Sequence, residues 1–324
     1  MNDVAIIGAG LAGLAAARGL GKKAKVRLFE KSWRAGGRMS TRTGSYEFDH
    51  GAQYFTARTS AFKSFLDPFI EQGIIARWDA RFVELDNCTV TSRRRWDADY
   101  PHYVSVPGMN ALCQALAKDL DVHYETCAGG IKPNGSNWEL MDTNDQSLGS
   151  YDWVVTAIPA EQVSAIMPSK FSHHHAVRRK SMLPCHTLML GYRQAPELDF
   201  DAALVKNSAI SWISVNSSKP GRPADFCLLA HSSNAWAANN LGLEDASVIE
   251  LMIKELGDIS KQDMSNAAHI DLHRWLYANI EKQTGNQALI DADNRLAAIG
   301  DWCIKGRVES AFISGRKLAM SCPL

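Results

Sequence analysis

The sequence predicts an α/β protein in which a parallel sheet is interrupted by an inserted, mostly antiparallel α+β domain. Two observations support this prediction. Short apolar runs followed by glycine turns, which are typical of parallel α/β sheets, occur near both ends of the chain, at residues 4–13 and 296–301. Between about residues 161 and 287 the residue pattern changes and predicts strands rich in Trp, Leu and Val. Both ends can contribute to one sheet only if the middle segment is an insertion.

The first predicted unit is a strand, a tight turn and a helix. Residues 4–7 form an apolar run, and the glycine turn 8–13 then enters the Ala-rich helix 11–20. In a G-x-G-x-x-G turn the backbone can approach a pyrophosphate, whose charge is stabilised by free N–H groups of the helix. A second strand, 25–29, ends at Glu30, whose carboxylate can accept hydrogen bonds from ribose hydroxyls. The turn alone would be weak evidence, but strand, helix, strand and acid in this order predict a dinucleotide-binding, Rossmann-like domain.

A second glycine-rich turn, Arg34–Met39, follows shortly after Glu30. The Arg38 guanidinium can pair bidentately with a pyrophosphate, an arrangement that NAD-only dehydrogenases do not usually have. In isolation this segment would be interpreted as a surface loop with solvated arginines. Its position directly after Glu30 favours a cofactor contact, and it points to FAD.

The C-terminal segment completes the predicted FAD site. Residues 296–299 form a short apolar strand, after which Asp301 can bind ribityl or ribose hydroxyls. A helix beginning near Val308 would direct its N-terminal amides toward the flavin edge on which negative charge accumulates during reduction. The alternative is that the small residues between Ser310 and Gly315 only allow close helix packing. The predicted cofactor-binding residues are Gly8, Gly10, Leu11, Ala12, Gly13, Glu30, Lys31, Gly37, Arg38, Met39, Gln53, Tyr54, Gly300, Asp301, Val308 and Glu309.

The expected domain organisation is discontinuous. An FAD-binding domain is assigned to residues 1–58, 105–160 and 288–324, and a substrate domain to residues 59–104 and 161–287. Further helices are predicted at 62–73, 107–120 and 245–256, and strand-like alternation over 74–90 is broken at Asp86 and Asn87. Further strands are predicted at 122–126, 138–141, 150–158, 188–192, 210–215, 226–231 and 269–277.

Composition and charge argue against several classes of protein. The 35 basic and 35 acidic residues leave no net charge that would attract nucleic acid or an anionic membrane. The 7 cysteines lack C-x-x-C spacing, which predicts neither a zinc site nor a disulfide framework and fits a reducing cytoplasm. Apolar runs stay short of the roughly 18 residues that a membrane span needs. His173–His175 is interpreted as a solvated stretch without a metal, and Arg93–Arg95 as a solvated face.

Several runs of residues are more specific than the glycine fingerprint. They are Gly36–Met39, Asp49–Arg58, Pro107–Met109, His273–Ala278 and Gly300–Cys303. They resemble the bacterial renalases, which belong to the wider amine oxidase-like flavoproteins with the p-hydroxybenzoate hydroxylase type of fold. The resemblance spans most of the chain. It implies non-covalent FAD, hydride removal from 2- or 6-dihydro isomers of NAD(P)H to give NAD(P)+, and reoxidation by oxygen to hydrogen peroxide. One departure lies at Glu281 and Lys282, where a proline-rich turn would be expected.

The chemistry implied by the resemblance agrees with the residues present. A dihydropyridine gives up hydride because its ring becomes aromatic, so the enzyme mainly has to stack this ring against the flavin. We therefore assign no residue as a catalytic acid or base and no metal ligand. For each aromatic residue of the predicted pocket, the alternative is ordinary core packing. The predicted substrate-pocket residues are Phe55, Thr56, Arg58, Trp96, Trp212, His231, Trp236, His273, Trp275, Tyr277 and Ile304.

Two other functions stay open at this stage. A flavin amine oxidase acting on a small primary or secondary amine could use the same Trp and Tyr residues to sandwich a neutral amine. A flavin-binding scaffold or sensor would have a site closed to substrate. Lys219 and Arg222 are conceivable phosphate contacts, although turn lysines are mostly solvated. The predicted partners are thus a small-molecule dihydronicotinamide and molecular oxygen, and the sequence indicates no oligomeric state.

Overall fold

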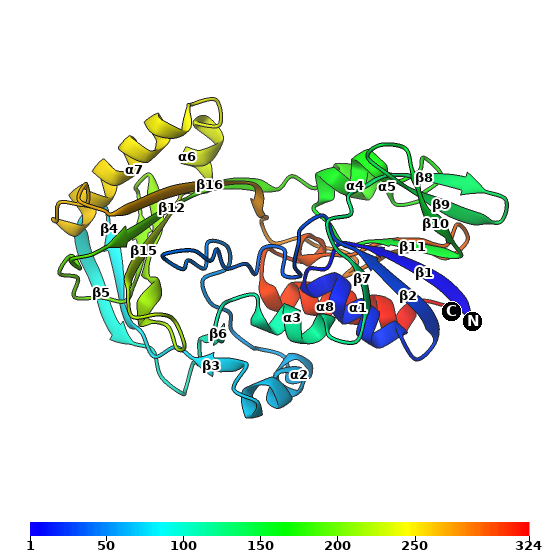
Figure 1. Cartoon of the computed structure of the whole chain (residues 1–324), viewed down its shortest axis with the longest axis horizontal. Helices are drawn as coiled ribbons and strands as arrows, with labels where there is room; N and C mark the ends of the chain where they lie inside the picture. Colours follow the sequence, from blue (N-terminus) through cyan, green and yellow to red (C-terminus); the bar gives the residue numbers. More distant parts are fainter. Residues whose placement is uncertain (324) are drawn as a thin grey trace. The chain divides into compact units, whose positions relative to one another are not determined.

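The computed structural model describes residues 1–323, and the chain divides into two compact units (Figure 1). Unit 1 comprises residues 1–39, 110–182 and the chain from Asn279 on, and unit 2 comprises residues 40–109 and 183–278. These limits differ from the expected domains at four places, because residues 40–58 and 105–109 belong to unit 2, and residues 161–182 and 279–287 to unit 1. The assignment of residues 161–182 has a clear cause: the backbone N–H of Ser172 donates to Asp291 Oδ2 at 2.7 Å, which ties this segment to unit 1.

Within residues 1–323, unit 1 is built on a six-stranded sheet of order β17-β18-β11-β1-β2-β7. Its strands are β17 (Leu289–Asp291), β18 (Leu296–Ala298), β11 (Trp153–Thr156), β1 (Asn2–Ile7), β2 (Ala24–Phe29) and β7 (Asp121–His123). All neighbouring pairs are parallel except β17 and β18 at the edge. The predicted parallel α/β fold is thereby confirmed. The chain reaches β11 and β18 only after long excursions, as an inserted domain requires.

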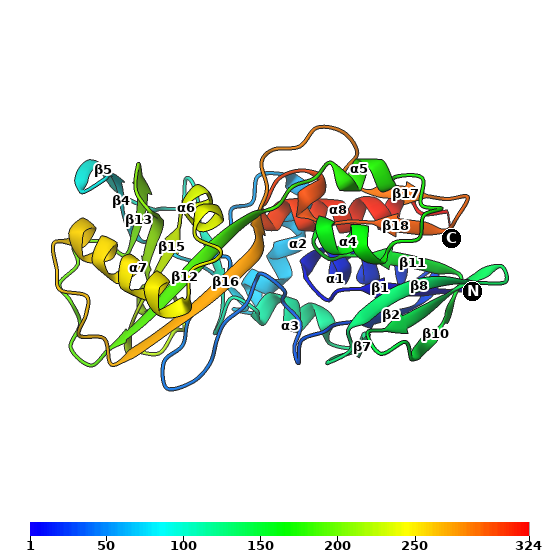
Figure 2. The same cartoon turned by 90° about the horizontal axis from the view of Figure 1, so that it is seen from above.

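Helices α1 (Leu11–Leu20) and α8 (Val308–Ser321) lie side by side in unit 1 (Figures 1 and 2). Their approach is close, because a Cβ on Gly315 would lie 2.2 Å from the carbonyl oxygen of Ala12. Close packing, the alternative considered for the small residues of the last helix, is therefore present. Helix α3 (Ala111–Ala117) is shorter at both ends than the predicted helix 107–120.

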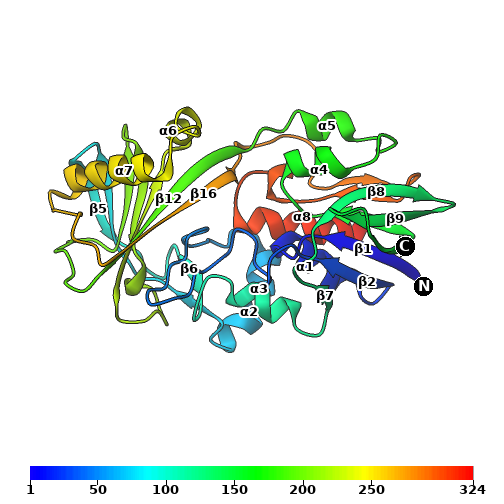
Figure 3. The same cartoon turned by 45° about the horizontal axis from the view of Figure 1, so that its top comes forward.

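An antiparallel sheet that the sequence did not predict as such completes unit 1 (Figure 3). It consists of β8 (Ala128–Asn134), β9 (Asn137–Asp142) and β10 (Ser147–Tyr151). Strand β8 was missed because two glycines and a proline interrupt its apolar pattern. Two short helices, α4 (Ala160–Ile166) and α5 (His174–Arg178), follow β11. His174 Nε2 lies 3.0 Å from the carbonyl oxygen of Met167, so the interpretation of the histidine run as a solvated stretch was wrong for this residue.

In the described part of the chain, unit 2 contains a seven-stranded sheet of order β16-β12-β15-β14-β13-β4-β5. The strands are β16 (His269–Asn279), β12 (Leu183–Tyr192), β15 (Phe226–Ser232), β14 (Ile210–Val215), β13 (Ala202–Lys206), β4 (Arg81–Asp86) and β5 (Thr89–Arg95). The break predicted at Asp86 and Asn87 is the turn between β4 and β5. Smaller elements are α2 (Ser60–Glu71), β3 (Ile75–Arg77), β6 (Tyr103–Ser105), α6 (Asn234–Asn239) and the 3-10 turns η1 (Asn216–Ser218) and η2 (Asp301–Cys303).

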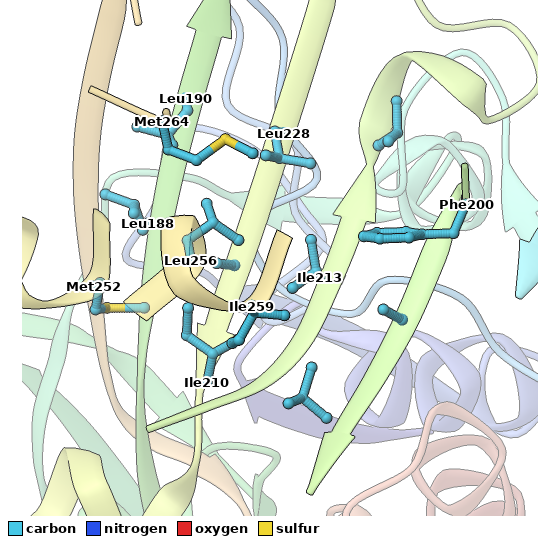
Figure 4. Packing of buried hydrophobic residues seen from close by; sticks show 14 of the residues in the cluster. Leu188, Leu190, Phe200, Ile210, Ile213, Leu228, Met252, Leu256, Ile259 and Met264 are labelled. Carbon is cyan, nitrogen blue, oxygen red and sulfur yellow. The ribbon is translucent and has the colours of Figure 1, made fainter. Parts of the chain in front are cut away.

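Helix α7 (Asp245–Ser260) covers one face of this sheet (Figure 2). Leu188 of β12 and Ile213 of β14 point toward Met252 and Leu256 of the helix (Figure 4). Because side chains alternate along a strand, the residues next to these core positions point to the opposite face. That second face carries most of the polar and aromatic residues that the sequence placed in a substrate pocket.

Candidate functional site

The first part of the site is the glycine turn between β1 and α1. Gly8 has a φ of 104°, which L residues with side chains rarely adopt, and its N–H donates to Phe29 O at 2.8 Å. A Cβ on Gly13 would lie 2.1 Å from the carbonyl oxygen of Gly8. Gly10 occupies the N-cap of α1 and has no side chain with which to cap the helix. The turn thus offers free helix N–H groups to an anion.

Glu30 lies buried at the end of β2, where its carboxylate connects two loops. Oε2 accepts a hydrogen bond from the N–H of Ala9 at 2.8 Å, and Oε1 accepts one from the N–H of Ser32 at 2.9 Å. Each carboxylate oxygen can accept more than one hydrogen bond. The geometry therefore fixes the carboxylate beside the glycine turn and leaves acceptor capacity for ribose hydroxyls.

The second glycine turn lies directly against the first. Gly36 pairs with Gly10 in an isolated bridge, and the N–H of Gly36 donates to Ala9 O at 3.1 Å. In the described residues, no atom lies within 4 Å of a Cβ built on Gly10, and a Cβ on Gly37 would meet only Gly10 Cα, at 3.5 Å. Two stretches of bare backbone thus form one cradle. A cradle of this kind fits a pyrophosphate, and we conclude that the residues of unit 1 suit a dinucleotide cofactor.

Arg38 and Asp301, predicted as separate cofactor contacts, pair with each other. Arg38 Nη1 donates to Asp301 Oδ2 at 2.9 Å, and Nη2 donates to Oδ1. Asp301 is 5% exposed. This bidentate pair connects the second glycine turn to the turn η2, so two segments far apart in the sequence meet at one place in unit 1.

The last predicted cofactor segment surrounds Gly300. Its N–H donates to Ser314 Oγ at 3.0 Å, which fixes α8 against the end of β18. The Trp302 indole N–H donates to Ile158 O at 2.9 Å, and a Cβ on Gly300 would lie 2.3 Å from that indole nitrogen. Glu309 is buried in the first turn of α8, a favourable position for a carboxylate. Of the remaining predicted cofactor residues of unit 1, Leu11, Ala12 and Met39 are buried, Val308 is half-buried and Lys31 is exposed.

Unit 2 has a cluster of histidine and tryptophan side chains on the sheet face opposite α7. Trp212 of β14 lies directly across from His231 of β15 in the strand register. On β16, His273 and Trp275 have ring centroids 4.3 Å apart. Sequence analysis placed these four residues in the substrate pocket, and the structure brings them to one face. Tyr277 is half-buried and follows on the same face of β16.

His50 joins this cluster and was not among the predicted site residues. Its ring stacks on Trp275 at 5.4 Å and 18°, and meets His273 edge-on at 4.9 Å. Its backbone oxygen accepts hydrogen bonds from Trp275 Nε1 at 2.9 Å and Thr187 Oγ1 at 3.1 Å. Burial, helped by His273 and Arg42, lowers the pKa of His50 to about 4. The sequence contained a signal, because His50 lies in the run Asp49–Arg58 that resembles the renalases.

Gln53 lies at the centre of a hydrogen-bond network in unit 2. Its Oε1 accepts hydrogen bonds from Ser214 Oγ at 2.6 Å and Lys219 Nζ at 3.1 Å. Its Nε2 donates to the backbone oxygens of Asp49 and Gly51, the latter at 3.0 Å, and lies 3.3 Å from His231 Nε2. Both polar atoms of the Gln53 side chain therefore have hydrogen-bond partners within unit 2.

Beneath Gln53 lies a completely buried ionic group of Asp49, Lys219 and Arg222. Asp49 Oδ2 is 3.2 Å from Lys219 Nζ and 2.6 Å from Arg222 Nη2, and all three side chains are 0% exposed. Burial alone would raise the pKa of Asp49, but the two cations lower it below its usual value. Burial lowers the pKa of Lys219 to about 8 against the attraction of Asp49. Lys219 and Arg222 are therefore structural here, and the idea that they contact phosphate was wrong.

Trp96, Trp212 and Tyr54 belong to a packed aromatic cluster. Trp96 is 4% exposed and stacks on His102 at 3.7 Å, while Tyr54 lies 4.9 Å from Trp96 and 5.4 Å from Trp212. Trp96 is therefore a core residue, which is the alternative considered for each aromatic residue of the predicted pocket. Arg93, which precedes it on the exposed strand β5, pairs with an aspartate at the surface.

The other predicted pocket residues occupy different environments. Phe55 is 4% exposed and pairs through its backbone with Tyr103, so it is a core residue. Trp236 lies on α6 and packs against the core under α7, across the sheet from His231, which removes it from the cluster. Thr56 is half-buried and Arg58 exposed in the same loop. Ile304 belongs to unit 1, where its N–H donates to Asp301 O at 2.9 Å.

The fold and the glycine cradle define a dinucleotide-binding oxidoreductase of the flavoprotein type. A family model described as NAD(P)-binding Rossmann-like domain matches residues 6–69, and one described as flavin containing amine oxidoreductase matches residues 64–322. The second match covers most of the chain, so the protein belongs to the flavin-containing amine oxidoreductase family. It is accordingly a flavin-dependent oxidoreductase.

Individual relatives agree with this assignment. A renalase from Mus musculus is 21% identical over 313 residues, covering 89% of this chain and 88% of the relative. A putative protoporphyrinogen oxidase from Exiguobacterium sp. 255-15 superposes with a TM-score of 0.79 at 13% identity, covering 99% of this chain and 98% of that one. Wild-type putrescine oxidase bound to putrescine gives a TM-score of 0.73 at 15% identity and covers 98% of both chains. At these identities the two solved structures support the fold alone.

Across residues 1–323, no group of three or more His, Cys, Asp or Glu side chains is arranged to hold a metal ion. In the same residues, no helix has both the length and the apolar character needed to cross a membrane.

Proposed function

We propose that the protein is an FAD-dependent oxidase that removes hydride from 2- or 6-dihydro isomers of NAD(P)H. The products are NAD(P)+ and, after oxygen takes the electrons, hydrogen peroxide. The relationship to a mouse renalase and the runs that resemble bacterial renalases support this substrate class. We further propose that FAD is held non-covalently, with its pyrophosphate in the cradle of Gly10 and Gly37 and its ribose on Glu30.

The observation that carries the proposal is the uncharged character of the cluster on unit 2. Burial lowers the pKa of His50 to about 4 and that of His231 to about 3, and it also lowers the pKa of His273. These rings are therefore neutral near pH 7. The two nearby carboxylates are already paired, Asp49 with two cations and Asp271 with Arg42. A neutral dihydropyridine ring suits such a surface. A neutral amine would suit it as well, so the renalase relationship and the donor screen below distinguish the two substrate classes.

In this proposal the residues of unit 2 bind and orient the ring. FAD, when bound, supplies the hydride acceptor. The hydride leaves a ring carbon with both bonding electrons and the ring becomes an aromatic pyridinium, so no proton has to be removed by a side chain. The imidazole of His231 and the indole of Trp275 offer flat surfaces for stacking, and the buried ring of His50 supports Trp275. Their main contribution is to restrict the orientation of the substrate ring.

The test is an anaerobic screen of electron donors with the purified protein. We expect 2- and 6-dihydroNAD(P) to bleach the visible flavin band rapidly, and primary or secondary amines to leave it unchanged. Ordinary NADH serves as the matched control for dinucleotide binding. Rapid bleaching by amines alone would replace this proposal by the amine oxidase alternative. Failure of every donor would favour a scaffold or sensor. Acid release followed by chromatography identifies the flavin and shows whether it is bound non-covalently.

A further inference from the structure

The hydrogen-bond network around Gln53 fixes which end of its side-chain amide is the oxygen and which is the nitrogen. The orientation of the Gln53 amide follows from the chemistry of its partners. Lys219 is fully buried and its ammonium can only donate hydrogen bonds, so the atom 3.1 Å from it must be the amide oxygen. The backbone oxygens of Asp49 and Gly51 can only accept, so the atom facing them must be the amide nitrogen. Both ends of the side chain give the same orientation.

This orientation restricts the protonation of His231. The Gln53 amide nitrogen lies 3.3 Å from His231 Nε2 and has no lone pair with which to accept a hydrogen bond. A proton on His231 Nε2 would therefore face another donor. The remaining arrangement leaves Nε2 unprotonated and places the ring proton on Nδ1.

The surroundings of His231 act in the same direction. Burial lowers the pKa of His231 to about 3, and the charges of Lys219 and His50 add to this effect. A hydrogen bond to the backbone of His50 opposes it but is the weaker influence. His231 as a residue is half-buried and lies across from Trp212 in the strand register. Its exposed part is available for contact with a ligand.

We propose that Gln53 is a positioning residue that locks His231 as a neutral imidazole protonated at Nδ1, so that His231 serves substrate as an uncharged stacking surface and not as an acid or base. This inference rests on the proposed function for the identity of the ring that stacks. It goes beyond that function by giving Gln53 a positioning role and His231 a stacking role. It also gives the buried Lys219 a purpose, because its ammonium fixes the orientation of the Gln53 amide.

The direct test is the tautomer of His231, which can be read without any substrate. Protein labelled with 15N at histidine gives two-bond 1H–15N correlations that distinguish Nδ1–H, Nε2–H and doubly protonated rings. We expect the Nδ1–H pattern for His231, unchanged between about pH 5.5 and 7.5, the range in which an ordinary histidine titrates and Lys219 is still mostly protonated. An Nε2–H pattern, or titration within this range, would overturn the proposal.

Two variants test whether Gln53 is the cause. Gln53→Glu replaces the donor by an acceptor of the same shape, and we expect His231 to move to the Nε2–H or doubly protonated form. Ser214→Ala is the matched control, because a hydroxyl can donate or accept and so does not set the direction of the amide. We expect this control to keep the wild-type tautomer. A Gln53→Glu spectrum identical to wild type would contradict the proposal, and if this variant does not fold, the wild-type spectrum still decides.

Kinetics then test the stacking role. We expect His231→Ala to lower kcat/KM for a dihydropyridine about tenfold, the loss of one aromatic contact, and His231→Phe to restore most of that loss. Equal losses in both variants would show that the ring nitrogens are needed and would refute the role. If no dihydropyridine reduces the flavin at all, the proposed function fails, whereas the tautomer measured by NMR remains a separate result.

Discussion

Gly10 and Gly13 occupy one turn for different physical reasons. A Cβ on Gly13 would lie 2.1 Å from a backbone oxygen, whereas one on Gly10 would meet open space in the described part of the chain. Gly13 is thus required by the fold, whereas the open space at Gly10 is available to a ligand. The sequence motif alone does not distinguish these roles.

This difference predicts opposite outcomes for two alanine variants. Gly13→Ala should lower the free energy of unfolding by about 2–3 kcal/mol, because backbone must shift to admit the methyl group. Gly10→Ala should keep wild-type stability but bind FAD at least about tenfold more weakly, since the methyl group enters the cradle proposed for the pyrophosphate. Urea denaturation of the flavin-free proteins and titration with FAD measure the two effects. Equal stability of the two variants would contradict the assignment.

The buried group of Asp49, Lys219 and Arg222 leads to a second prediction at the residue scale. Asp49→Asn would leave two buried cations without their shared carboxylate, and we expect it to destabilise the protein by about 3–5 kcal/mol. The control is Asp258→Asn, which removes an exposed ion pair with Lys254 and should cost less than about 0.5 kcal/mol. Thermal or urea unfolding of both variants checks this. A small effect of Asp49→Asn would show that the buried group relaxes or admits water.

At the scale of elements, the contact between α1 and α8 explains the small residues of the last helix. Gly315 lies against the carbonyl of Ala12, and a Cβ on Gly19 would lie 2.4 Å from the Ala319 side chain. The helix that follows η2 is therefore held against the helix that follows the glycine turn. This contact brings Asp301 and Arg38 of the same unit within hydrogen-bond distance.

Enlarging this contact should destabilise the protein. Gly315→Ala places a methyl group 2.2 Å from Ala12 O, and we expect a loss of about 1–3 kcal/mol together with weaker FAD binding. Met320→Ala on the same helix is the control, because Met320 is 64% exposed and should change stability by less than about 0.5 kcal/mol. Unfolding midpoints of the two variants are compared. Unchanged stability of Gly315→Ala would mean that the helices separate without cost.

At the scale of the whole molecule, acidification is expected to destabilise the protein. The pKa of His50 is lowered to about 4 and that of His231 to about 3, mainly by burial. Both rings stay neutral when folded, but they take up protons when unfolded below about pH 6.5, so the unfolded state then binds more protons. Stability is fully present above this pH. It should fall by about 1.4 kcal/mol per pH unit for each histidine between about pH 6 and 4.

Urea denaturation at a series of pH values measures this slope. His231→Phe removes one of the two groups, so its stability should fall less steeply with acid than that of the wild type. Equal slopes in the two proteins would show that His231 does not contribute.

The helices and strands with strong periodic patterns were predictable from the sequence. Helix α1 was predicted at its observed bounds, and the strand predicted at 210–215 is β14. Strand β13 and helix α6 were missed, because short elements carry too few residues for a periodic pattern to emerge. Strand β12 is longer than predicted, since its first residues include Pro184 and polar side chains that the sheet nevertheless accommodates.

The sequence by itself determined the glycine cradle, because a turn of bare backbone and the acid after the second strand are local features that need only neighbouring residues. Only the tertiary structure decided which distant side chains meet. Arg38 pairs with Asp301, and His50 joins the cluster of His273 and Trp275, across separations that no local pattern encodes. Likewise, Trp96 is buried in the aromatic cluster whereas Trp275 is half-buried on the sheet face, although both carry an indole, because what the fold places against each ring differs. Burial, which sets both packing and charge state, is a property of the folded chain.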